Sequence, residues 1–141
     1  MLIARDIMTT TPVTVDTTAT VRRAVELLQL LDIRHLPVVN DESELVGMIS
    51  DRDLRALSIP YFAGPEHLGD LRTALNAPVA TLMNGDVLSV DANADASDVV
   101  ELMLENKIGA VPVTDAEGML VGIISYIDVL RAVPLDNSTA E

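Results

Sequence analysis

The sequence predicts a mixed α/β fold, of the α+β kind, made of two copies of one strand-helix-strand-strand-helix unit. The chain has 141 residues, which is the size of one ordinary domain. Shifted by 75 positions without a gap, it matches itself from Met8 on Met83 to Asp53 on Asp128. In each copy, an apolar pattern of helical period precedes two short apolar stretches that polar turn residues separate. A tandem repeat therefore decides the fold class.

The first half of each copy is predicted to be a short strand followed by an amphipathic helix. The extended pieces are expected at residues 13–15 and 88–90. Thr20 and Asp95 then stand where a helix N-cap is expected, because short polar side chains accept hydrogen bonds from the first free N–H groups. Apolar residues follow at helical spacing, namely Val21, Ala24, Val25, Leu28 and Leu31 in the first copy and Ala96, Val99, Val100 and Met103 in the second.

The second half of each copy is predicted to be a hairpin and a closing helix. The expected hairpin strands are 36–39 with 45–50 and 111–114 with 120–125, and the expected closing helices are 51–57 and 126–133. Pro37 and Pro112 cannot donate to a sheet, so we expect them at strand starts or edges. Gly47 and Gly122 lie inside apolar strands, which indicates a bulge or a close approach of a ligand or another backbone. The alternative is an ordinary packing glycine.

These elements divide the chain into four parts. The first repeat covers residues 1–57, a connector covers 58–77, the second repeat covers 78–133, and a tail covers 134–141. The connector is expected to contain a helical turn at 68–75. It also holds Tyr61 and Phe62, whose role the sequence leaves open.

Composition excludes several classes of protein. The net charge of −13 repels nucleic-acid phosphates, so direct nucleic-acid binding is not expected. No apolar run reaches the roughly 18 residues of a membrane span, and the N-terminus lacks a signal-peptide pattern, so we expect a cytoplasmic protein without a membrane partner. The absence of cysteine excludes disulfides and thiolate metal sites, and two histidines, His35 and His67, are too few for a histidine cage.

The two copies resemble a pair of cystathionine β-synthase (CBS) domains, the arrangement called a Bateman module. The matching segments are 6–9, 33–39 and 46–54 in the first copy and 108–113 and 121–129 in the second. The resemblance implies two units packed through their sheets with pseudo-twofold symmetry, and two clefts for adenosine ligands such as AMP, ADP, ATP or S-adenosylmethionine. These would be ligands rather than required cofactors. It further implies a free-standing regulatory module, a homodimer, and a regulated protein that the sequence does not name.

A Ser-x-x-Asp pair closes the hairpin of each copy, as Ser50 with Asp53 and Ser125 with Asp128. An aspartate can accept hydrogen bonds from both hydroxyls of a ribose, and the serine can bond the ribose or a phosphate. The alternative is an ordinary helix cap. Because both copies carry the pair, the sequence favours a ligand site.

Basic residues are expected beside only one of the two pairs. Arg34, His35 and Arg52 stand in the first copy at positions that resemble the family's phosphate contacts, whereas the second copy has Gly109, Ala110 and Ile127 there. We therefore expect the first cleft to take a phosphorylated ligand. The second is expected to favour adenosine or a cationic ligand such as S-adenosylmethionine, or to stand empty.

The leading interpretation is a sensor that binds an adenosine ligand and transmits its presence through dimer or partner contacts. The alternative is a structural dimerisation module with vestigial clefts, which nucleotide binding would distinguish. An enzyme is not expected, because the sequence has no convincing serine–histidine–acid set, glycine-rich phosphate loop or metal-ligand cluster. No catalytic or metal-binding residue is predicted.

Overall fold

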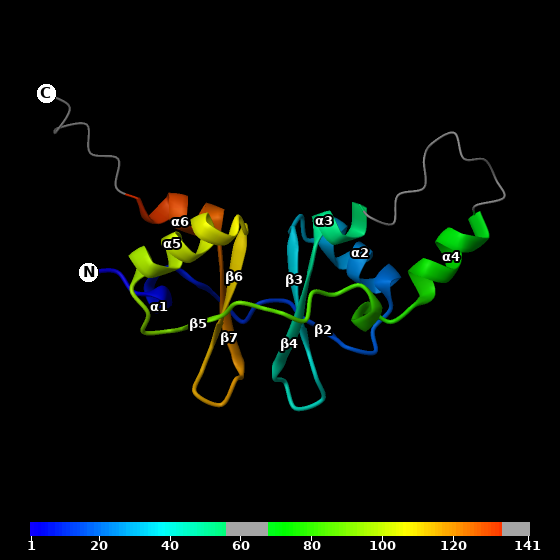
Figure 1. The fold of residues 1–141 in the computed structure, drawn as a ribbon, viewed down its shortest axis with the longest axis horizontal. Coiled ribbons are helices and arrows are strands. Elements are labelled where there is room, and N and C mark those ends of the chain that lie inside the picture. The colour runs from blue at the N-terminus through cyan, green and yellow to red at the C-terminus, as the bar shows by residue number, and fades with distance from the viewer. Residues whose placement is uncertain (56–67, 134–141) are drawn as a thin grey trace, which may run out of the picture. The chain divides into compact units, whose positions relative to one another are not determined.

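The computed structural model describes residues 1–55 and 68–133, which belong to two compact units. The central unit consists of Val13–Val87, and the split unit joins Met1–Pro12 to Leu88–Glu141. Both are mixtures of helices and strands, as predicted (Figure 1). Tyr61, Phe62 and the tail at 134–141 lie outside the described residues.

The central unit contains a three-stranded sheet with the order β2-β3-β4. Strand β2 runs parallel to β3, and β4 runs antiparallel to it. The elements are β2 (Val15–Asp16), α2 (Val21–Leu30), β3 (His35–Val39), β4 (Leu45–Ser50), α3 (Asp51–Arg55), α4 (Leu68–Asn76) and a 3₁₀ turn at Val79–Thr81. Helix α4 confirms the helical turn predicted at 68–75.

The split unit repeats this plan and adds a strand from the start of the chain. Its sheet has the order β1-β7-β6-β5, with β1 antiparallel to β7, β7 antiparallel to β6, and β5 parallel to β6. The elements are α1 (Ala4–Ile7), β1 (Thr9–Thr10), β5 (Val90–Asp91), α5 (Ala96–Asn106), β6 (Ala110–Thr114), β7 (Leu120–Ser125) and α6 (Tyr126–Ala132).

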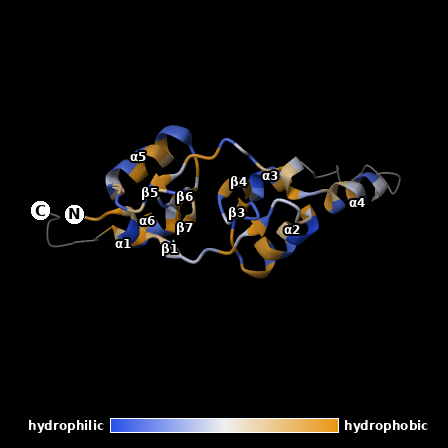
Figure 2. Ribbon diagram, turned by 90° about the horizontal axis from the view of Figure 1, so that it is seen from below, coloured by the Kyte–Doolittle hydropathy of each residue, from blue (hydrophilic) through white to orange (hydrophobic). Residues whose placement is uncertain are grey.

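Helices α2 and α5 are amphipathic, as their sequence patterns predict (Figure 2). In α2 the Thr20 hydroxyl accepts a hydrogen bond from Arg23 N at 3.2 Å, which confirms the predicted cap. Asp95 stands at the N-cap of α5, but its side chain caps no N–H. Leu31 was included in the helical apolar pattern, but it lies just past the end of α2 and is 41 % exposed, so it does not belong to the buried face of the helix. None of the described helices combines the length and apolar character needed to cross a membrane.

The prolines lie inside strands, so the expectation of strand starts or edges is wrong. Pro37 is the middle residue of β3 and faces Met48 of β4. The N–H and C=O of Met48 both bond to Asn84, on the side away from β3. Pro37 therefore occupies a position where β4 requires no donor from it. Pro112 faces Ile123 in the same way, and Ile123 pairs with Thr9 on its other side.

Two glycines allow methionine side chains to lie against the hairpins. The register of β3 and β4 shifts directly after the Val38–Gly47 pair, which confirms a bulge there. A Cβ on Gly47 would overlap the Met83 sulfur, and a Cβ on Gly122 would lie 2.5 Å from the Met8 sulfur and 3.0 Å from the Thr9 carbonyl oxygen. Each strand thus needs glycine because of a close neighbour in its own unit.

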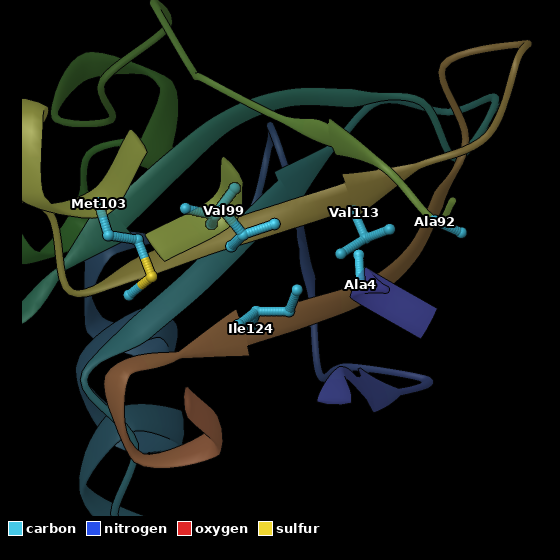
Figure 3. Packing of buried hydrophobic residues seen from close by; sticks show 7 residues of the cluster. Ala4, Ala92, Val99, Met103, Val113 and Ile124 are labelled. Carbon is cyan, nitrogen blue, oxygen red and sulfur yellow. The ribbon is translucent and has the colours of Figure 1, made fainter. Parts of the chain in front are cut away.

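The first residues of each repeat complete the core of the compact unit that contains most of the other repeat. Ala4 is fully buried with Val99, Val113 and Ile124 of the split unit (Figure 3), and its N–H donates to Ala94 O at 2.8 Å. In the central unit, Val79 is fully buried and its N–H donates to Ala19 O at 2.7 Å. The repeats at 1–57 and 78–133 are therefore sequence units whose boundaries differ from those of the compact units.

Candidate functional site

The first site is the junction of β4 and α3, where Ser50 and Asp53 bond to each other. The Asp53 Oδ2 atom accepts hydrogen bonds from Ser50 N at 2.8 Å and Ser50 Oγ at 3.0 Å. Asp53 N donates to Ser50 Oγ at 3.3 Å, which completes a capping box. The ordinary cap considered from the sequence is thus present. It uses one carboxylate oxygen, and no described residue donates a hydrogen bond to the other, Oδ1.

The second site repeats this geometry at the junction of β7 and α6. The Asp128 Oδ2 atom accepts from Ser125 N at 2.8 Å and Ser125 Oγ at 3.1 Å, and Asp128 N donates to Ser125 Oγ at 3.3 Å. The second carboxylate oxygen differs, because Asp128 Oδ1 accepts a hydrogen bond from Thr9 Oγ1 at 3.4 Å. Sequence reasoning gave Thr9 no role, because nothing in the order of residues indicates that β1 pairs with β7.

His35 is the titratable group next to the first site. It lies directly opposite Ser50 in the sheet, at a pair position where side chains are close. Burial of its ring lowers the pKa of His35, the charges of Asp53 and Asp51 act to raise it, and Arg34 acts to lower it. The corresponding residue opposite Ser125 is Ala110.

The two arginines lie near the first site without bonding to its carboxylate. Arg34 directly precedes β3, and its carbonyl accepts a hydrogen bond from Asp51 N at 2.9 Å. Arg52 is in the first turn of α3, and both side chains are exposed. Within 1–55 and 68–133 neither arginine forms an ion pair, whereas Arg55 bonds to Asp51 at 2.9 Å. Both guanidinium groups remain accessible to an anion from solvent.

The side chains of these sites are hydrogen-bonding groups. The described part of the chain contains no group of three or more His, Cys, Asp or Glu side chains placed to hold a metal ion. Each site offers a carboxylate oxygen, a serine hydroxyl and a short helix that the capping box fixes to the end of a strand. Such a carboxylate is suited to accept hydrogen bonds from a polyol.

Comparison with known families gives one match that covers both repeats. The family model named CBS domain matches residues 4–59 and 79–135. Among curated proteins, hypoxic response protein 1 of Mycobacterium tuberculosis is 31% identical over 134 residues, which are 95% of this chain and 87% of that protein. The chain spans only 45% of the uncharacterized protein MJ1225 and 22% of an inosine-5'-monophosphate dehydrogenase, both from Methanocaldococcus jannaschii.

Solved structures match over nearly the whole chain. The CBS-pair protein CBSX2 of Arabidopsis thaliana has a TM-score of 0.80 and 34% identity, covering 92% of both chains. A structure of CBSX2 in complex with AMP has a TM-score of 0.79 and 33% identity, covering 94% of this chain and 96% of that one. Hypoxic Response Protein I, solved with two coordinated zinc ions, has a TM-score of 0.76 and 30% identity, covering 94% and 100%.

Proposed function

This chain belongs to the CBS-domain family, and from that membership we propose that it is a regulatory module that binds an adenosine-containing ligand. The family predicted from the sequence is thereby confirmed. The observation that carries the proposal is the Ser–Asp pair at the end of each hairpin, because the same bonds recur in both repeats within 0.1 Å. CBSX2, which is 33% identical, was solved with AMP.

The geometry supports a role for Asp53 and Asp128 in holding a ribose. Each capping box fixes the carboxylate through Oδ2, so the orientation of Oδ1 is set before a ligand arrives. A carboxylate fixed in this way loses little conformational entropy when it accepts a ribose hydroxyl, and bonds to a charged acceptor are the stronger kind. Ser50 and Ser125 then serve both the cap and the ligand.

We propose that the first site prefers a phosphorylated adenosine. The exposed guanidinium groups of Arg34 and Arg52, which are near Ser50 in sequence or across the hairpin, can supply positive charge. His35 lies opposite Ser50, and its lowered pKa favours the neutral ring, which can still donate one N–H to a phosphate. A phosphate brings negative charge to a protein of net charge −13, so local cations are needed to offset the repulsion. The second site has Ala110 opposite Ser125, and it suits uncharged or cationic adenosine ligands.

The ligand's effect is proposed to reach another protein through a homodimer or a partner surface. Helix α6 supports this proposal, because Ile127 is 44 % exposed and Leu130 is 66 % exposed in the single chain. Apolar groups of this kind are commonly covered in assemblies. The regulated protein, a cytoplasmic location and the absence of an enzymatic reaction remain predictions.

Thermal unfolding with AMP, ADP, ATP and S-adenosylmethionine tests the proposal. A ligand present at about 100 times its Kd stabilises the folded state by roughly 2.7 kcal/mol, which raises Tm by roughly 5–10 °C in a chain of this length. We expect such a shift for at least one ligand. It should disappear in the double variant Asp53→Asn/Asp128→Asn, in which the amide oxygen still accepts the capping bonds.

Asp95→Asn is the control for each single replacement, since it removes one carboxylate charge at a helix start where the side chain caps nothing. Light scattering on the same samples is expected to report a mass of twice 15.1 kDa. If all four ligands leave Tm unchanged at millimolar concentration, and calorimetry detects no binding heat, the structural dimerisation module is the correct alternative.

A further inference from the structure

The two aspartates differ in how many hydrogen bonds they can still accept. A carboxylate has about four lone-pair positions, two on each oxygen. At Asp53 the capping box occupies two positions, both on Oδ2, and no described residue donates to Oδ1. Two positions therefore remain, which equals the number of hydroxyl donors that an adenosine ribose presents.

Asp128 has one position fewer because Thr9 occupies part of Oδ1. Its Oδ2 accepts the same two bonds from Ser125, and the Thr9 hydroxyl donates a third bond to Oδ1. One position remains. A ribose with two donors must therefore displace Thr9 or leave one hydroxyl without an acceptor on Asp128, and the contribution of that hydrogen bond is then lost.

The backbone of Thr9 is held by the sheet, which keeps its side chain within reach of Asp128. Thr9 pairs with Ile123 in the sheet, two residues before Ser125. The preceding residue, Met8, lies against Gly122, and Met8 N donates to Ala4 O at 2.9 Å. These contacts hold the N-terminal segment beside Asp128 although the two are 119 positions apart in the chain.

The equivalent position in the first site does not engage the carboxylate. Asn84 is the residue that corresponds to Thr9. It exchanges backbone hydrogen bonds with Met48 at 2.9 and 3.1 Å, and this pair is the equivalent of Thr9 with Ile123. The Asn84 side-chain oxygen instead accepts a hydrogen bond from Asp86 N at 3.0 Å. The difference between the two aspartates thus arises from one residue of the repeat.

We propose that Thr9 sets the ribose selectivity of the second site, so that Asp128 accepts one ribose hydroxyl where Asp53 accepts two. The proposal rests on adenosine binding as the proposed function. It assigns different ligand classes to the two sites. The first distinguishes a ribose from a 2'-deoxyribose, whereas the second tolerates adenosine ligands in which one hydroxyl is missing or substituted.

Calorimetric titration with adenosine and 2'-deoxyadenosine tests this assignment one site at a time. The Asp128→Asn variant leaves the first site intact, and the Asp53→Asn variant leaves the second site intact. In each variant the asparagine keeps an oxygen that can accept the capping-box bonds. We expect 2'-deoxyadenosine to bind about 2–10-fold more weakly than adenosine in the Asp128→Asn protein, as the loss of one hydrogen bond implies. In the Asp53→Asn protein the difference should be less than about 2-fold.

Adding Thr9→Val to the Asp53→Asn protein removes the hydroxyl and keeps the branched shape. It should tighten adenosine binding by about 2–10-fold and restore discrimination against 2'-deoxyadenosine. Thr9→Ala should do the same, so the result does not depend on how valine packs. Thr9→Ser keeps a hydroxyl, and Thr10→Val changes the neighbouring strand residue. Both controls should behave like the unmodified second site.

Equal discrimination by the two sites, or no effect of Thr9→Val and Thr9→Ala, would overturn the assignment while leaving the proposed function intact. The failure of the proposed function has a different signature, in which the unmodified protein binds neither nucleoside at millimolar concentration.

Discussion

At the scale of the single residue, Asp53 and Asp128 have a local role and a proposed ligand role at once. The capping box orients the carboxylate and satisfies the first N–H groups of a short helix. Because Oδ2 performs that work, only Oδ1 is left to respond to a ligand. A change at either aspartate therefore affects both folding and binding, which is why the asparagine variants are more informative than alanine variants.

His35 predicts a pH dependence of stability. Burial lowers its pKa, so in the pH range below the ordinary value of about 6.5 the folded state binds fewer protons than the unfolded chain. The free energy of unfolding should therefore fall as the pH falls through about 6.5 toward the lower pKa of the folded state. Burial is the largest cause, and among the charged neighbours Asp53 and Asp51 reduce the effect while Arg34 adds to it.

Urea unfolding of the unmodified protein and of His35→Gln, at pH 7.5 and at pH 5.5, measures this contribution. All other titratable groups are the same in the two proteins, so the difference between their losses of stability measures the contribution of the His35 imidazole. We expect the unmodified protein to lose more stability than His35→Gln between the two pH values. Equal losses would show that the environment of His35 does not disfavour its protonated form.

The sequence predicted the Ser–Asp pairs, but not that a threonine would bond to the second carboxylate oxygen of only one of them. Both partners of each pair lie within four consecutive positions, so local helix-capping rules are enough to find them. The Thr9 hydroxyl reaches Asp128 through the pairing of β1 with β7, and that pairing depends on long-range packing. A contact of this kind has no local signature.

At the scale of the element, the hairpins were predicted most accurately. Strands β4 and β7 have the predicted bounds, because apolar runs between polar turn residues and a helix cap define both ends. The short strands β2 and β5 end one residue later than predicted and are shorter than expected. The position of Pro37 was predicted wrongly because the sequence alone does not show at which positions of a central strand no N–H donor is needed.

The glycine of β7 predicts a loss of stability on substitution. In Gly122→Ala the added Cβ would lie 2.5 Å from the Met8 sulfur and 3.0 Å from the Thr9 carbonyl oxygen. The methionine side chain can rotate, but the carbonyl belongs to β1 and can move only with that strand. We expect Gly122→Ala to destabilise the protein by about 1–3 kcal/mol, measured by thermal unfolding.

Gly69→Ala is the control for that substitution. No heavy atom lies within 4 Å of the position of its added Cβ, and Gly69 is in helix α4, where alanine is favoured by up to about 1 kcal/mol. The control should be neutral or stabilising. A Gly122→Ala protein as stable as the unmodified one would show that β1 can move away from β7 at little cost.

At the scale of the whole molecule, the repeat of the sequence and the compact units of the structure are offset. The sequence predicted two copies because identical spacings recur along the chain. It did not predict that residues 1–12 belong with the second repeat and residues 78–87 with the first. The first residues of each repeat contribute one fully buried side chain, Ala4 or Val79, to the compact unit that contains most of the other repeat.

Two pieces of equal length test whether this offset determines folding. Residues 13–87 contain the complete central unit, whereas residues 1–75 contain the same repeat without Val79, Met83 and Asn84. Val79 is fully buried, and burial of a valine side chain alone contributes about 1.5–3 kcal/mol. Asn84 also shares two backbone hydrogen bonds with Met48, and the 1–75 piece lacks both.

We expect the 13–87 piece to unfold cooperatively in urea, with a midpoint well above that of the 1–75 piece. Equal midpoints, or a 1–75 piece that is the more stable of the two, would mean that the repeats fold as the sequence divides them and that the exchanged segments are added afterwards.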